Sequence, residues 1–307
     1  MPVPDYKTLI DAPTWAFINT TNATYPDDTA SLTITDQRRI YDAMCDVFRQ
    51  PRPATLSVQD RLIAGVPCRV YGPVSGVSVI YMHGGGFVVG GLHSHDDVCA
   101  EIATRTDLRV ISVDYRLSPD HKHPAAFDDA VAVVRATPGP VLLVGDSAGG
   151  NLCAAVAQAM RGDTRLLGQV LIYPGLGGDR TKGSYLTHAH APMLTAADVE
   201  FYAGIRFDGP APATDDTSSP LQATDFTHLP PTYAVAAECD PLCDDAHAYA
   251  TAIRAAGGRA HAITEAGLVH GYLRARHSVP RATASFTRII AAITALAAGD
   301  WPFGDAK

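Results

Sequence analysis

Short apolar runs of β-type residues alternate along this chain with stretches of helical periodicity, and this alternation restricts its fold most. Each run ends in a Gly-rich or polar turn, and a helical pattern follows. Such an order is typical of a parallel sheet with helices on both faces. Runs that are apolar on both faces suit strands buried in such a sheet. The expected strands are Val77–Met82, Leu108–Val113, Val141–Val144, Gln169–Tyr173, Thr232–Ala237 and Arg259–Thr264.

An antiparallel hairpin is expected ahead of these strands, at the edge of the sheet. Thr55–Ile63 and Val66–Tyr71 flank the turn pair Ala64-Gly65, which suits a two-residue hairpin loop. Apolar residues at helical spacing predict the helices. The expected helices are Asp36–Phe48, Pro124–Thr137, Ala148–Met160, Ala196–Ile205 and Pro280–Leu296.

Two segments fall outside this alternation. Residues 1–50 precede every strand, and residues 179–230 are too many for a plain connection between two strands. We expect both segments to form a cap over the open end of the sheet. The α/β core would then comprise residues 51–178 and 231–307.

Composition excludes several classes of protein. Hydrophobic residues make up 47% of the 307 residues and charged residues only 18%, which argues for a large buried interior. The formal net charge of −8 gives no general attraction for nucleic acid. No apolar run approaches the ~18 residues of a membrane span, and the first residues lack the features of a secretory signal. We therefore expect a cytoplasmic protein, with its six scattered cysteines reduced.

The strongest chemical signal is the stretch Val141–Gly150, which reads VLLVGDSAGG. An apolar strand runs into G-x-S-x-G and then into a helix, which is the context of a nucleophile elbow. The turn would force strained backbone angles on Ser147, and a Cβ at Gly145 or Gly149 would collide with the strand or the helix. The spacing fits neither of the common Gly-rich phosphate-binding motifs.

A second signal precedes it in the stretch Val79–Phe87, which reads VIYMHGGGF. After His83, the glycines Gly84, Gly85 and Gly86 leave backbone N–H groups uncovered, so that these groups can approach a substrate oxygen. Acyl transfer needs such donors because a negative charge develops on the former carbonyl oxygen. The two motifs together predict an acyl-transfer site.

These motifs resemble those of the hormone-sensitive-lipase-like family of α/β-hydrolases. The segment Asp114–Ala126, DYRLSPDHKHPAA, is similar to a third block of that family, with Ser118 and Asp120 as mild departures. The resemblance extends from about Val77 to Tyr272. It implies an α/β-hydrolase fold with a mostly parallel sheet of about eight strands and a helical cap, and a carboxylic ester hydrolase that needs no cofactor.

An elbow serine needs a histidine base, which comes last in this fold's order of Ser, Asp or Glu, and His. His270 lies in Gly267–Tyr272, GLVHGY, in a loop past the last expected strand, and this segment resembles the terminal motif of the family. We assign the other late histidines to a strand or to helical patterns. They are His247, His261 and His277.

The acid is expected at Asp240, in the segment 238–242, ECDPL. It follows a parallel strand at its carboxyl end, where catalytic side chains collect. The family resemblance agrees, although Cys243 replaces a usual basic residue. Asp244 and Asp245 are the rivals, but acids at the start of a helix are common for dipole reasons alone.

The expected mechanism follows from these assignments. Ser147 attacks the acyl carbon, His270 takes its proton, and Asp240 fixes the imidazole tautomer. Asp146 can bond to a neighbouring loop. The oxyanion would be held by the N–H groups of Ala148 and, as the family motif implies, of Gly85 and Gly86.

Other functions stay open or are disfavoured. An amidase or acyltransferase could use the same triad, and a small-molecule receptor could share the fold, although the presence of His270 counts against a receptor. Three H-x-H pairs have metal-like spacing, but none lies in a clear strand, so no metal is expected. The expected partner is a small-molecule ester, and a homodimer is compatible with the sequence. The pairs are His93/His95, His121/His123 and His188/His190.

Overall fold

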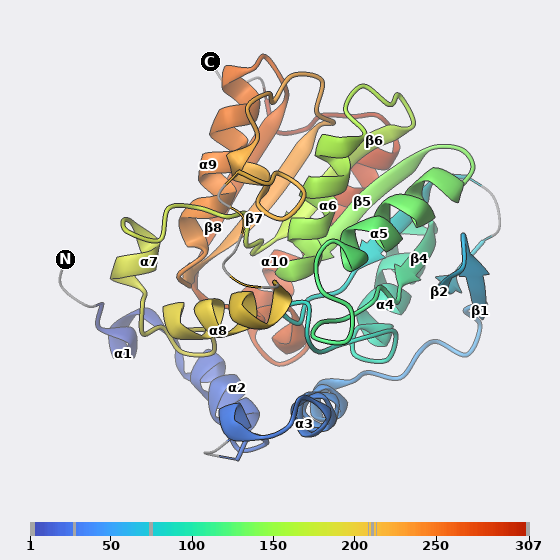
Figure 1. Ribbon diagram of the computed structural model, residues 1–307. Coiled ribbons are helices and arrows are strands. Elements are labelled where there is room, and N and C mark those ends of the chain that lie inside the picture. The colour runs from blue at the N-terminus through green and yellow to red at the C-terminus, as the bar shows by residue number, and fades with distance from the viewer. Residues whose placement is uncertain are drawn as a thin grey trace.

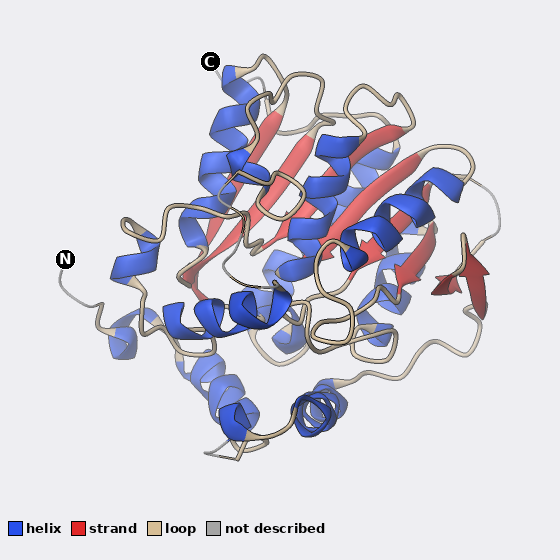
Figure 2. Cartoon of the chain, in the orientation of Figure 1, coloured by secondary structure: helices blue, strands red, loops and turns tan. Residues whose placement is uncertain are grey.

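The computed structural model describes residues 4–26, 29–73, 76–207, 209, 212 and 214–304. An eight-stranded sheet runs through its centre (Figure 1), and helices cover both of its faces (Figure 2). The strand order is β1-β2-β4-β3-β5-β6-β7-β8. The strands are β1 (Val58–Ile63), β2 (Val66–Tyr71), β3 (Ser78–Met82), β4 (Arg109–Val113), β5 (Val141–Asp146), β6 (Leu166–Ile172), β7 (Thr232–Cys239) and β8 (Ala260–Val269).

The edge of the sheet is the predicted hairpin. β1 pairs antiparallel with β2, and Ile63 lies opposite Val66 across the two-residue turn. β2 is antiparallel to β4, and every later neighbour in the sheet is parallel. The predicted α/β class and mostly parallel sheet are therefore confirmed.

The central strands are buried on both faces, which explains their uninterrupted apolar sequence. All residues of β3 are inaccessible to solvent. Because successive side chains of a strand point to opposite faces, Val79 and Tyr81 join one hydrophobic layer. Ile80 and Met82 join the other. The sheet therefore separates two cores.

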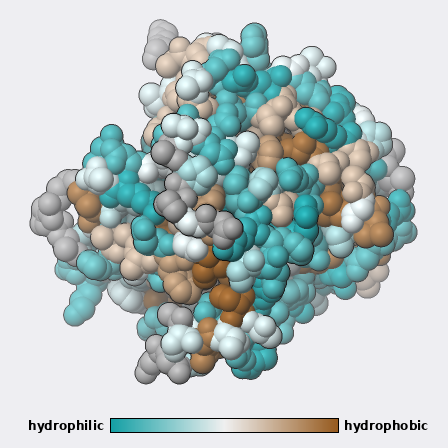
Figure 3. Space-filling view, in the orientation of Figure 1, coloured by the Kyte–Doolittle hydropathy of each residue, from teal (hydrophilic) through white to brown (hydrophobic). Residues whose placement is uncertain are grey.

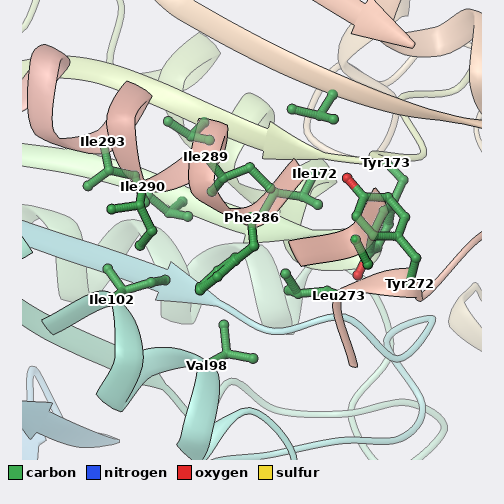
Figure 4. Packing of buried hydrophobic residues seen from close by; sticks show 14 of the residues in the cluster. Val98, Ile102, Ile172, Tyr173, Tyr272, Leu273, Phe286, Ile289, Ile290 and Ile293 are labelled. Carbon is green, nitrogen blue, oxygen red and sulfur yellow. The ribbon is translucent and has the colours of Figure 1, made fainter. Parts of the chain in front are cut away.

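Helices cover each core. α5, α6 and α9 pack on one face of the sheet, and α4 and α10 pack on the other. Figure 4 shows Phe286 and Ile289 of α10 in one cluster with Val98 and Ile102 of α4. These helices are α4 (Asp96–Thr106), α5 (Ala125–Ala136), α6 (Ala148–Ala159), α9 (Cys243–Ala255) and α10 (Pro280–Ala297).

The remaining helices lie beyond one end of the sheet (Figure 1). They come from the two segments outside the strand–helix alternation, whose role as a cap remains a prediction. Thr195 and Asp198 form a reciprocal capping box at the start of α8. These elements are α1 (Tyr6–Leu9), α2 (Ala12–Asn22), α3 (Ile34–Phe48), α7 (Ser184–Thr187) and α8 (Ala196–Arg206), with short 3-10 turns at Thr29–Ser31 and Pro220–Gln222.

Two differences from the sequence prediction have physical causes. β8 continues to Val269 instead of ending near Thr264, because its pairing with β7 resumes beyond an irregularity and sets Cys239 opposite Val269. His270 therefore follows the strand directly, without an intervening loop. The helix α2 was not expected, because its buried face includes Thr14 and Thr21 and so shows no apolar stripe.

Candidate active site

The turn between β5 and α6 has the strained geometry of a nucleophile elbow. Ser147 has φ 53° and ψ −116°, a conformation that L-residues rarely adopt. A Cβ at Gly145 would lie 2.8 Å from the carbonyl oxygen of Met82, and a Cβ at Gly149 would overlap that same oxygen. The two glycines are therefore required because β3 and the start of α6 both pass close to the turn.

Three side chains from distant parts of the chain form a hydrogen-bonded series at this turn. The Ser147 Oγ lies 2.8 Å from His270 Nε2, and His270 Nδ1 lies 2.6 Å from the Asp240 Oδ2. A carboxylate beside Nδ1 favours the tautomer with its proton on Nδ1. Nε2 is then the acceptor for the Ser147 hydroxyl. The arrangement can pass the serine proton to the imidazole.

Asp240 directly follows the last residue of β7 and is completely buried. Its second oxygen, Oδ1, accepts a hydrogen bond of 2.9 Å from the Leu242 backbone N–H. Both carboxylate oxygens therefore have donors, which fixes the orientation of the carboxylate toward His270.

The rival acids bond elsewhere. Asp244 accepts a hydrogen bond of 2.8 Å from the Ser184 backbone N–H. Asp245 accepts bonds from the Leu176 N–H, at 2.6 Å, and from the Tyr185 hydroxyl, at 3.2 Å. Burial raises the pKa of Asp245 to about 7. Neither carboxylate contacts His270.

The other late histidines also lie apart from Ser147. His261 stacks on Tyr233, His247 bonds to Thr264, and His277 bonds to Glu101. The sequence assignment of His270 therefore agrees with the geometry, and its catalytic role remains a prediction.

The Gly-rich loop presents free backbone donors beside Ser147. Gly85 has φ +129° and Gly86 has φ +60°, both unfavourable for residues with a Cβ. Within the described part of the chain, the N–H groups of Gly85, Gly86 and Ala148 donate to no acceptor. A Cβ at Gly86 would lie 2.7 Å from the Tyr202 ring. These three donors can face the oxygen of a bound acyl group.

Asp146, which we expected to bond to a neighbouring loop, holds the Gly-rich loop to the elbow. It accepts hydrogen bonds from the Tyr81 hydroxyl at 2.8 Å, the Gly84 N–H at 3.0 Å and His95 Nε2 at 3.2 Å. Burial favours the neutral acid, but His95 and the donated bonds outweigh it and lower the pKa of Asp146. The sequence missed His95 because only the tertiary fold brings it to Asp146.

His83 fixes the other side of the loop. Its ring is completely buried and stacks on Tyr115 with centroids 4.3 Å apart. Nδ1 lies 2.8 Å from the Gly84 carbonyl oxygen, and the Tyr115 hydroxyl donates to the His83 carbonyl at 2.6 Å. Burial lowers the pKa of His83 to about 3, so this ring is neutral. His83 therefore supports the loop and carries no charge.

Two cavities meet at Ser147. The larger, of about 580 Å³, is also lined by His270, and the smaller, of about 130 Å³, is also lined by Ala148. Tyr202 of α8 borders both. Figure 3 shows hydrophobic surface gathered between α8 and the helices α2 and α3. Aromatic side chains of the expected cap line both cavities, whereas Phe17 and Trp15 pack in a core. Those at the larger cavity are Tyr25, Tyr41, Phe48, Phe201 and Tyr202, and those at the smaller are Tyr185, Tyr202 and Phe207.

One histidine of each H-x-H pair has a hydrogen-bond partner elsewhere in the protein. His95 bonds to Asp146, His123 to Asp215 and His188 to Tyr6. Among the described residues, no three side chains of the usual metal-ligating types come together. The six cysteines carry free thiols. Where the chain is described, none of its helices has the length and apolar character to cross a membrane.

Comparisons with known proteins agree with this geometry. Residues 79–274 match the profile of the alpha/beta hydrolase fold family. Esterase LipI of Mycobacterium tuberculosis is 37% identical over 276 residues, which cover 81% of this chain and 85% of LipI. Carboxylesterase NlhH of the same organism is 35% identical over 75% of this chain and 78% of NlhH.

Solved structures of esterases also resemble this chain. The ester hydrolase EH1AB1 from the Lake Arreo metagenome superimposes with a TM-score of 0.84 at 30% identity, covering 94% of this chain and 98% of EH1AB1. An esterase of the bacterial hormone-sensitive lipase family superimposes with a TM-score of 0.83 at 27% identity, covering 92% of this chain and 98% of that esterase.

Proposed function

Because this chain belongs to the hormone-sensitive-lipase-like family of alpha/beta hydrolases, we propose that it hydrolyses carboxylic esters through an acyl-enzyme on Ser147. One observation carries the proposal. The hydrogen-bonded series Ser147–His270–Asp240 ends at a strained elbow, beside three free backbone N–H groups. This combination supplies a nucleophile, a base and an oxyanion site together.

The reaction begins when the Ser147 Oγ attacks the ester carbonyl carbon while His270 Nε2 takes the hydroxyl proton. Asp240 stabilises the imidazolium that forms. The tetrahedral oxyanion accepts hydrogen bonds from the oxyanion donors, which are the N–H groups of Gly85, Gly86 and Ala148. His270 then returns the proton to the leaving alcohol. A water molecule, activated by His270, attacks the acyl-enzyme and releases the acid.

The names of relatives and the size of the cavities support this activity and a preference for short acyl chains. Besides esterase LipI and carboxylesterase NlhH, a relative from Pseudomonas putida that is 30% identical is an ethyl acetate hydrolase. A short acyl group suits the smaller cavity, of about 130 Å³. Residues 1–50 and 179–230 act as the cap in this proposal, because both segments contribute walls to the larger cavity.

A fluorophosphonate probe tests the assignment of the nucleophile. We expect it to label Ser147 alone, and Ser147→Ala to lower ester hydrolysis by at least about 10³-fold. Ser278→Ala is the matched control, since Ser278 does not line either cavity. Peptide mapping that finds the label on another serine would overturn the proposal. Matched aryl esters and anilides separate an esterase from an amidase, and faster anilide hydrolysis would contradict ester specificity.

A further inference from the structure

A positively charged side chain lies in the wall of the larger cavity, together with Ser147 and His270. Arg274 belongs to the 3-10 turn Tyr272–Ala275, four residues after His270, and is half-buried. Its Nη1 donates to the Ser94 carbonyl oxygen at 3.0 Å, and its Nη2 donates to the Tyr41 hydroxyl at 2.7 Å. These two bonds fix the guanidinium against the cavity wall.

Arg274 has no carboxylate partner within ion-pair distance among the described residues. The contrast is Arg276, which lines the same cavity but bonds to Asp97 at 2.6 Å and to Glu101 at 2.8 Å. Asp146 interacts with the Arg274 charge through space. However, the oxygens of Asp146 already accept the three hydrogen bonds from Tyr81, Gly84 and His95. The charge of Arg274 is therefore not neutralised by direct contact.

Arg274 also has N–H groups that donate to no acceptor in the described residues. A guanidinium carries five N–H groups, and the two hydrogen bonds of Arg274 leave its Nε without an acceptor in the described residues. A planar guanidinium suits a carboxylate, which can accept two hydrogen bonds from it. Apolar side chains, including Met44, Phe48 and Phe201, line the same cavity and suit the carbon skeleton of a ligand.

The smaller cavity offers a different arginine. Arg206 lies with its guanidinium carbon 3.5 Å from the centroid of the Phe87 ring, and it bonds to the Ser218 carbonyl oxygen and to Asn151 Oδ1. The Phe87 ring therefore covers one face of this guanidinium closely, whereas the Tyr41 ring lies 5.1 Å from the guanidinium carbon of Arg274. Arg274 is the better candidate for binding an anionic group.

We propose that Arg274 binds a carboxylate on the substrate, so that the preferred esters carry one free carboxylate group. Two kinds of ester have this chemistry: monoesters of dicarboxylic acids, and acyl esters of hydroxy acids. The inference rests on the proposed function, since it names the substrate class of the same site. The charge of Arg274 would hold the far end of the substrate while Ser147 attacks the ester carbonyl.

Two pairs of substrates test the proposal, each with an isosteric neutral control. Methyl hydrogen glutarate is compared with methyl glutaramate, which places the charge on the acyl side. 4-Acetoxybenzoate is compared with 4-acetoxybenzamide, which places it on the alcohol side. We expect kcat/KM to be higher for the carboxylate in at least one pair. Equal or lower kcat/KM for the carboxylate in both pairs would overturn the proposal.

Variants then assign the preference to Arg274. We expect Arg274→Met to lower kcat/KM for the preferred carboxylate ester by about 10- to 100-fold relative to its amide, the loss typical of a charged hydrogen bond. Arg274→Lys should retain part of the preference because it retains the charge. Arg105→Met is the matched control, since Arg105 lies outside both cavities and its removal changes the net charge equally. An unchanged preference in Arg274→Met would contradict the proposal.

A binding measurement separates this inference from the proposed function. Calorimetric titration of Ser147→Ala with benzoate and with benzamide requires no turnover and no change at Arg274. Tighter binding of benzoate supports the carboxylate site even if ester hydrolysis fails. Equal or weaker binding of benzoate, with normal hydrolysis of neutral esters by the unaltered protein, overturns the inference and leaves the esterase proposal standing.

Discussion

Asp240→Asn would keep the size and shape of a completely buried side chain and remove its charge. The two oxygens of Asp240 face different donors: Oδ2 faces His270 Nδ1, and Oδ1 faces the Leu242 N–H. An asparagine has one oxygen and one NH₂ group for these two positions. The Leu242 N–H can only donate, so the amide oxygen belongs there and the NH₂ group turns to His270.

That orientation gives the imidazole the wrong tautomer. With an NH₂ donor beside it, His270 Nδ1 must accept, and the ring proton moves to Nε2, which then cannot take the Ser147 proton. Flipping the amide would restore the tautomer, but it would set two donors against each other at Leu242, at a cost of about 1–3 kcal/mol.

The magnitude follows from these two effects. The flip costs about 1–3 kcal/mol, and the lost charge removes a charge-assisted bond worth about 1.5–3 kcal/mol. Together they amount to about 2.5–6 kcal/mol, so turnover should fall between about 10²- and 10⁴-fold. The upper value is close to the loss found when a triad aspartate is changed to asparagine in other enzymes.

The assay is kcat/KM for p-nitrophenyl acetate, with circular dichroism as the check that the fold persists. Asp244→Asn is the matched control, because Asp244 bonds to the Ser184 N–H and not to His270. We expect this control to remain within about threefold of the unaltered protein, since its contact lies outside the proposed triad. Near-normal turnover in Asp240→Asn, with a large loss in Asp244→Asn, would refute the reasoning.

Three further predictions concern stability and the Gly-rich loop. Gly86→Ala should lower kcat about 10²- to 10³-fold, since its Cβ would meet the Tyr202 ring and displace an oxyanion donor; a change below threefold in steady-state assays would contradict this. Asp245, with its pKa raised to about 7 by burial, holds a proton in the folded state that the unfolded chain loses near pH 4, so its contribution to stability falls as the pH rises from about 4 to 7. Urea titrations measure this as the difference in free energy of unfolding between the unaltered protein and Asp245→Asn. The difference should fall by up to about 4 kcal/mol across that pH range, and a constant or rising difference would contradict the prediction. Phe286→Ala, which empties a buried position of α10, should lower the free energy of unfolding by about 3–5 kcal/mol, whereas the exposed Leu186→Ala should change it by less than about 0.5 kcal/mol.

Much of the fold could be predicted because its signals are local. The apolar run of β3 and the hairpin turn at Ala64-Gly65 reflect burial and turn geometry that neighbouring residues determine. The family resemblance was confirmed, and the profile match over residues 79–274 nearly coincides with the stretch from Val77 to Tyr272 on which it was based. The helix α2 was missed because threonines occupy part of its buried face, and such a face has no apolar period.

Part of the candidate site could likewise be predicted from local sequence signals. The sequence alone determined the elbow at Ser147 and the Gly-rich loop, because each depends on small residues at fixed spacing beside a strand. It also singled out Asp240 and His270, through their places after strands and their likeness to family motifs.

Only the tertiary structure decided which distant groups meet. It brought His95 to Asp146 across 51 residues, and it placed Arg274 at the cavity wall through bonds to Ser94 and Tyr41, 180 and 233 residues away. Such contacts leave no periodic pattern in the sequence, because they arise when segments far apart along the chain pack together. The turns and buried strands could be predicted from neighbouring residues, whereas the positions of the charged groups around the cavity depend on the packing of the whole chain.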